Sequence, residues 1–130
     1  LGPNASTMHS SLTYNTKFGK FMLVGTHGQW VNIGNGPQLM TGVYYSLSTN
    51  LVDWESPVLI AFAKMPWTGI PPGVELPLSS GMAVYPSIID HDSPDPNFVW
   101  TDDEAYIYYS KQPTAGVVAS ILARRKITFK

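Results

Sequence analysis

The sequence contains no cysteine, which excludes disulfide bonds, thiol catalysis and a cysteine-ligated zinc or iron–sulfur site. It is also poor in charge, because charged residues make up 13% of the 130 residues, against about 25% in a typical domain. Eight Lys and Arg oppose nine Asp and Glu for a net charge of −1, without the basic cluster typical of nucleic-acid binders. No apolar run reaches the ~18 residues of a membrane-spanning helix. We therefore expect neither a nucleic acid nor a membrane as a partner.

The chain has the length of a single domain, and turn-forming and aromatic residues are frequent in it. It has 11 Gly and 11 Pro, and 12% of its residues are Phe, Trp or Tyr. No segment keeps the period of an amphipathic helix over about 12 residues. Several segments instead alternate or run apolar in the manner of short strands. The sequence therefore predicts an all-β fold.

The expected strands fall into two blade-like units. The first unit, residues 9–62, has strands at 11–15, 21–26, 41–48 and 57–62, a tight turn at 17–20, a Gly-rich loop at 27–38 and a helical turn at 49–54. A connection rich in Pro and Gly spans residues 63–82, and proline there excludes a helix. The second unit, residues 83–130, has strands at 83–90, 104–110 and 120–129 around a loop at 91–98. A repeated antiparallel four-stranded unit is the blade of a β-propeller.

The stretch 42–59, GVYYSLSTNLVDWESPVL, resembles the YYSxSxDLxxWSxPxxL blade pattern of five-bladed β-propeller glycoside hydrolases of the family 43 type and their relatives. Tyr85–Asp90 with Tyr106–Tyr109 is similar to a late blade, and Arg125–Phe129 is similar to a closing strand. The resemblance implies a partial propeller of about two blades and a secreted or periplasmic location. In such a blade Trp54 is expected to plug the space between sheets, and Asp53 to accept backbone amides. A β-sandwich is the alternative fold.

Glycoside hydrolysis needs two carboxyl groups across the scissile bond. The resembling family carries two Asp and one Glu on three early blades, and this sequence lacks those motifs. The sequence around Glu75, GVELP, only loosely resembles the sequence around the family's general-acid glutamate. Asp90 and Asp92 are the other weak catalytic candidates. We therefore expect no hydrolysis by the chain alone.

Ligands of a propeller meet the ends of its innermost strands. This places His9, Ser10, Tyr85 and Ser87 as candidate carbohydrate-binding residues, with Trp30 in a loop as a ring on which a sugar can stack. For His9 and Trp30 ordinary packing is the simpler interpretation.

Oxygen-bearing side chains gather in the 91–98 loop and just before it, at Asp90, Asp92, Asp95 and Asn97. Such ligands suit calcium. Pro94 and Pro96 break the EF-hand pattern, however, so Asx-turn capping is favoured over a metal. No other cofactor is expected.

Two blades cannot close a ring, and unpaired edges and apolar faces favour association. We therefore expect a homo-oligomer or a section of a larger chain. Three functions remain open: a non-catalytic carbohydrate-binding or self-associating propeller section, a glycosidase whose site assembles between chains, and a structural module without a ligand.

Overall fold

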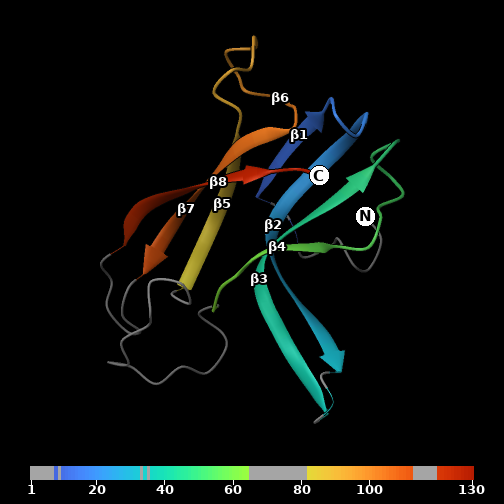
Figure 1. Cartoon of the computed structure of the whole chain (residues 1–130), viewed down its shortest axis with the longest axis vertical. Coiled ribbons are helices and arrows are strands. Elements are labelled where there is room, and N and C mark those ends of the chain that lie inside the picture. Colours follow the sequence, from blue (N-terminus) through green and yellow to red (C-terminus); the bar gives the residue numbers. More distant parts are fainter. Residues whose placement is uncertain (1–7, 9, 33, 35, 65–81, 113–119) are drawn as a thin grey trace.

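The computed structural model describes residues 8, 10–32, 34, 36–64, 82–112 and 120–130. Every regular element in these residues is a strand, so the predicted all-β class is confirmed. The strands are β1 (Ser11–Asn15), β2 (Lys20–Asn32), β3 (Pro37–Ser48), β4 (Val58–Phe62), β5 (Met82–Ile89), β6 (Trp100–Thr101), β7 (Glu104–Gln112) and β8 (Ile121–Thr128). They form two sheets that pack against each other (Figure 1).

Sheet A has the order β4-β3-β2-β1-β6. Strands β1 to β4 follow one another as an antiparallel meander. The predicted tight turn joins β1 to β2, and Gly19 there takes a φ of 63°, which costs a glycine little. The short β6, from the second half of the chain, pairs in parallel with the outer edge of β1, so that Asn15 lies opposite Thr101. This pairing covers part of an edge that would otherwise be open.

Sheet B has the order β5-β7-β8 and is a second antiparallel meander. The sequence predicts four strands in the first unit and three in the second, whereas the described residues give sheets of five and three. The difference arises partly because the loop before β7 contributes β6 to sheet A. Apart from its ends, the predicted connection over residues 63–82 lies outside the described residues.

The main core lies between the two sheets. Alternate residues of a strand point to opposite faces, and the inner faces supply the buried cluster: Met22, Val24, Val43 and Leu47 from sheet A, and Ile88, Ala105 and Ile107 from sheet B, with Phe129 after β8. β3 shows this alternation, since Val43 and Leu47 face the core while Tyr44 faces the opposite way.

The predicted loop at 27–38 is mostly strand. β2 continues to Asn32 and β3 begins at Pro37, with Gly28, Gln29 and Trp30 paired to residues of β3. Gly and Asn lower the strand propensity of this stretch, but the facing strand supplies the hydrogen-bond ladder. The far half of this hairpin projects beyond both sheets (Figure 1).

The predicted helical turn at 49–54 is also wrong, because these residues form a bend. The Oδ1 of Asn50 accepts the amides of Val52 and Asp53 at 2.9 and 2.8 Å. Asn50 thereby takes the capping role that the sequence assigns to Asp53. Trp54 does not enter the space between the sheets; it packs on the outer face of sheet A, against the cluster of Met8, Leu23 and Tyr44.

Candidate functional site

The outer face of sheet B carries aromatic and polar side chains. In β7, Ala105 and Ile107 are buried in the core, so Glu104, Tyr106 and Tyr108 point outward. Cross-strand register then adds Ser87 of β5 and Arg124 of β8, both directly opposite Tyr108. With His91, which follows β5, these residues form a group that we call the tyrosine–arginine patch: Ser87, His91, Tyr106, Tyr108 and Arg124.

The ring of His91 orders one end of the tyrosine–arginine patch. It stacks on the ring of Tyr106, with centroids 4.5 Å apart and planes 15° from parallel. Its Nε2 lies 2.9 Å from the hydroxyl of Tyr108. Two tyrosines of one strand therefore hold a single imidazole, which itself stays exposed to solvent.

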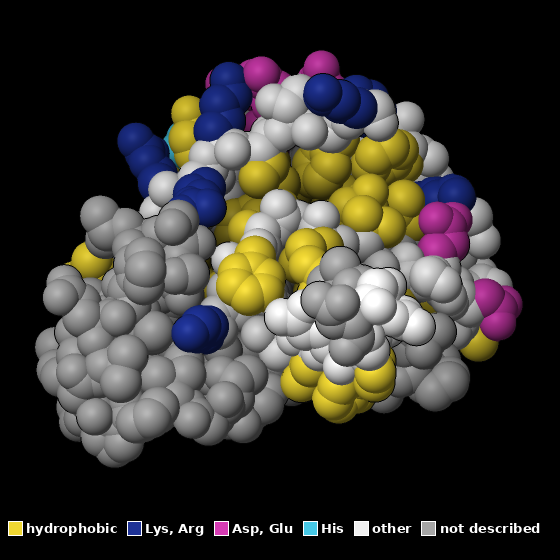
Figure 2. All heavy atoms as spheres, turned by 60° about the horizontal axis from the view of Figure 1, so that its bottom comes forward, with side chains coloured by type: hydrophobic (Ala, Val, Ile, Leu, Met, Phe, Trp, Pro, Cys, Tyr) yellow, Lys and Arg dark blue, Asp and Glu magenta, His cyan; other side chains and the backbone are white. Residues whose placement is uncertain are grey.

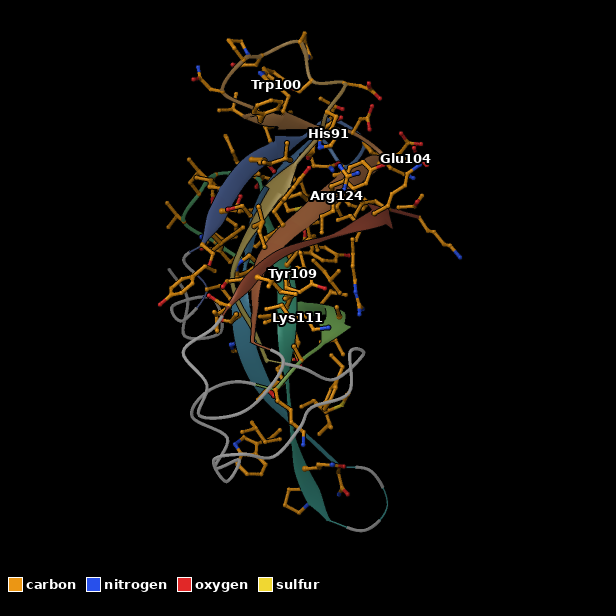
Figure 3. The ribbon with its side chains drawn as sticks, turned by 90° about the vertical axis from the view of Figure 1, so that its left-hand side faces the viewer. His91, Trp100, Glu104, Tyr109, Lys111 and Arg124 are labelled. Atoms are coloured by element: carbon orange, nitrogen blue, oxygen red, sulfur yellow. The ribbon has the colours of Figure 1, made fainter. Side chains whose placement is uncertain are left out.

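Arg124 completes the tyrosine–arginine patch. Its Nη1 donates to the Tyr108 hydroxyl at 3.3 Å, and its guanidinium carbon lies 5.1 Å from the centre of the Tyr106 ring, within cation–π range. The hydrogen bond to Tyr108 raises the pKa of Arg124. The patch thus offers exposed hydrogen-bonding groups beside partly buried rings. His91, Glu104 and Arg124 lie close together at one end of sheet B in Figure 3.

A small polar hollow adjoins the tyrosine–arginine patch. It has a volume of about 90 Å³ and is lined by Asp90, His91, Asp92, Glu104, Ala105, Tyr106 and Lys126. Lys126 forms an ion pair of 2.8 Å with Glu104, and this contact raises the pKa of Lys126. The structure thereby brings two of the three predicted carboxyl candidates, Asp90 and Asp92, to one place.

The aspartates of this loop are engaged by its backbone. Oδ1 of Asp90 accepts the amide of Asp92 at 2.9 Å, and Oδ1 of Asp95 accepts the amide of Asn97 at 2.7 Å. Hydrogen bonds of this kind form Asx turns, which the sequence analysis favours over a calcium site for this loop. Within the residues that the structure describes, no group of three or more His, Asp or Glu is placed to hold a metal ion.

Strands β1 and β5, one from each sheet, are in contact. The amide of Ile88 in β5 donates to the Oγ of Ser11 in β1 at 3.2 Å. Ser10 precedes that serine directly, and Ser87 precedes Ile88, so these two predicted ligand residues flank the contact between β1 and β5.

Tyr85 is the unusual residue of this edge. The pairing of β5 with β7 is interrupted between Val84 and Ser87, and Tyr85 takes a φ of 56° within the interruption. Its side chain is 81% exposed, while the adjacent Pro86 is fully buried. A left-handed backbone is strained for a tyrosine and marks a candidate functional position.

The other predicted site residues lie elsewhere. Trp30 is on the projecting half of the β2–β3 hairpin, opposite Leu39, and is 71% exposed. His9 and Glu75 lie outside the described residues. Sequence reasoning missed Tyr106, Tyr108, Arg124 and the role of His91. The alternation of EAYIYYS places the two tyrosines on one face, but their meeting with Arg124 depends on the β7–β8 register.

Comparison with protein-family models, with curated proteins and with solved structures finds no match. The part of the chain that the structure describes contains no helix long and apolar enough to cross a membrane. The function is therefore inferred from the geometry, together with the resemblance in the sequence.

Proposed function

We propose that the chain is a section of a β-propeller related to glycoside hydrolases, and that it binds carbohydrate without hydrolysing it alone. Two features support the propeller over a sandwich. Strands β1 to β4 of sheet A and strands β5, β7 and β8 of sheet B each form a meander, with β6 added at the edge of sheet A, whereas sandwiches commonly use Greek-key connections. The first strands of the two meanders, β1 and β5, are also in contact, as the innermost strands of adjoining blades would be.

The observation that supports carbohydrate binding is the solvent exposure of the Tyr85 ring. A strained backbone holds a largely exposed ring on the innermost strand of sheet B. An aromatic face is a suitable platform for the C–H side of a sugar ring. Ser87, two residues further along β5, lies beside Tyr108 and its partners, which are hydrogen-bonding groups of the kind that fix a ligand's orientation.

The carboxyl groups favour binding over catalysis. Asp90 is buried and its Oδ1 is already an acceptor within a turn, so it is poorly placed as an acid or nucleophile. Hydrolysis requires two carboxyl groups flanking a sugar. A glycosidase completed by a second chain is the alternative, with Asp92 exposed in the loop as its nearest contributor.

Calorimetric titration of the chain with xylo- and arabino-oligosaccharides tests the proposal. We expect Tyr85→Ala to weaken binding roughly tenfold, which corresponds to about 1.4 kcal/mol, and Tyr85→Phe to retain it, because stacking needs the ring. Trp30→Ala removes the competing aromatic platform and should leave binding unchanged. The absence of any heat of binding across the panel would instead favour the structural module without a ligand.

Aryl-glycoside turnover is measured on the same samples. We expect none from the parent chain. Turnover that rises with protein concentration and is abolished by Asp92→Asn would overturn the non-catalytic proposal in favour of the glycosidase assembled between chains.

We also propose that the chain associates with copies of itself through the outer face of sheet A. An apolar hollow of about 420 Å³ is lined there by Leu12, Thr13, Tyr14, Phe21, Val99 and Trp100. Trp100 is 43% exposed although its ring meets that of Tyr14 at 5.4 Å. Exposed apolar surface of this kind, on a chain with a net charge of only −1, favours contact with another copy.

Light scattering tests self-association. The parent should exceed the 14.3 kDa of one chain, and Trp100→Arg should reduce the mass to that value. Trp30→Arg is the matched control, an exposed tryptophan exchanged on the projecting hairpin. A parent that is monomeric at all concentrations, or equal loss of association in both variants, contradicts the proposed contact.

A further inference from the structure

A cleft opens between the two sheets, beside their edge strands β4 and β8. Sheet A contributes β3 and β4 and sheet B contributes β7 and β8, and the cleft has a volume of about 220 Å³. Its apolar walls are formed by Val43, Ile60, Phe62, Ile107, Tyr109 and Ile127. Figure 2 shows a face of the molecule on which hydrophobic side chains gather, with Lys and Arg and also Asp and Glu side chains around them. The size suits a ligand smaller than the drug-sized molecules that fill pockets of about 300–1,000 Å³.

Arg125 belongs to this cleft by its register. It lies directly opposite Ile107, whose side chain is buried in the core, so both project from the inner face of sheet B. Arg125 is nonetheless exposed, because β8 is an edge strand where the sheets separate. No Asp or Glu of the described residues forms an ion pair with Arg125.

A second cation follows on the same face. Lys111 of β7 lies opposite Ile121, is buried, and lines the cleft with Arg125. In Figure 3 it lies beyond Tyr109, away from His91 and Arg124. No carboxylate is among the described residues that line the cleft. The cleft therefore combines apolar walls with the exposed guanidinium group of Arg125.

We propose that the cleft binds a small amphipathic anion, a carboxylate with a short apolar tail. The tail packs between Ile60 and Ile127, where its removal from water is favourable. The carboxylate accepts hydrogen bonds from the guanidinium of Arg125, whose planar donors match its two oxygens. This site lies on the inner face of sheet B, and the tyrosine–arginine patch lies on the outer face.

Calorimetric titration of the full chain with sodium octanoate tests the proposal. The parent should show saturable binding, and Arg125→Gln should weaken it about tenfold through loss of the charge-assisted hydrogen bonds. Arg125 is exposed, so its substitution leaves the core intact. Arg124→Gln is the matched control, since it removes the same charge from the adjacent residue of the same strand, on the opposite face. Octanoate binding by this variant should equal that of the parent.

1-Octanol, which has the same tail without the charge, provides a comparison on the unmodified chain. It should bind more weakly than octanoate and equally to the parent and Arg125→Gln. Three results overturn the proposal: no saturable binding of octanoate, equal loss in the two arginine variants, or octanol binding as tightly as octanoate. If Arg125→Gln instead aggregates while octanoate binding persists, the proposal is also overturned. The charge of Arg125 then serves only to keep the edge strand β8 from pairing with another chain.

Discussion

Replacing Asn15 with Ala should destabilise the protein far more than its position near a strand end suggests. Asn15 is fully buried at the end of β1. Its Nδ2 donates to the Thr101 Oγ1 at 3.1 Å and to the Asp102 carbonyl at 2.7 Å. Its Oδ1 accepts the amide of Phe18 at 3.0 Å. One amide group therefore joins β1, its turn and the β6 segment.

The size of the effect follows from these three hydrogen bonds. Each contributes about 1 kcal/mol net, and a buried partner left unsatisfied costs about 1–3 kcal/mol. We expect Asn15→Ala to lower the free energy of unfolding by about 3 kcal/mol. With a urea m-value of about 2 kcal/mol/M, the midpoint falls by about 1.5 M.

Urea unfolding followed by tryptophan fluorescence measures this change. Asn97→Ala is the matched control, because Asn97 is exposed in the loop between β5 and β6; its midpoint should stay within about 0.25 M of the parent. Adding Thr101→Val to Asn15→Ala should cost less than the sum of the single changes, since contacting residues are coupled. If Asn15→Ala unfolds at the same urea concentration as Asn97→Ala, the amide does not hold β6 to sheet A.

Three further substitutions follow from packing and burial. In Gly42→Ala the new Cβ would lie 2.2 Å from the backbone oxygen of Ala61, so the free energy of unfolding should fall by about 2–3 kcal/mol. In Gly28→Ala the new Cβ meets only side-chain atoms that can move, so this substitution should cost less. Thermal unfolding compares the stability of the two variants. Phe129→Ala empties a buried core position and should cost about 3 kcal/mol in urea unfolding. Burial lowers the pKa of His27 below 6.5, so the unfolded chain binds this proton more tightly and stability should fall as the pH drops below 6.5. His27→Gln should remove that part of the pH dependence in urea midpoints measured from pH 7.5 to 6, and an unchanged slope would contradict the assignment.

Local patterns were sufficient for most strands. In β3, alternation sends Val43 to the core and Tyr44 outward, and the structure follows it. The far half of the β2–β3 hairpin was missed because Gly28 and Asn32 have low strand propensity; their pairing with Thr41 and Pro37 supplies what propensity lacks. Strand β6 was missed because two residues carry no periodicity, and it exists through its contact with β1.

The tyrosine–arginine patch required information that local patterns do not contain. Tyr106 and Tyr108 share a face by alternation, which the sequence shows. Their meeting with Arg124 depends on the register of β7 against β8, which is set by the packing of the whole sheet. The left-handed backbone of Tyr85 was equally hidden, because tyrosine rarely takes a positive φ and no glycine marks the position.

The strand register places the adjacent residues Arg124 and Arg125 in two different environments. Successive residues of a strand face opposite sides of the sheet, so Arg124 reaches the Tyr108 hydroxyl while Arg125 faces the cleft. A shift of β8 by one residue would exchange them. It would also carry the inward-facing Ile127 to the outer face and leave an open place in the core cluster that Ile127 packs against. The packing of Ile127 therefore favours the observed register, and the register gives each arginine its separate surroundings.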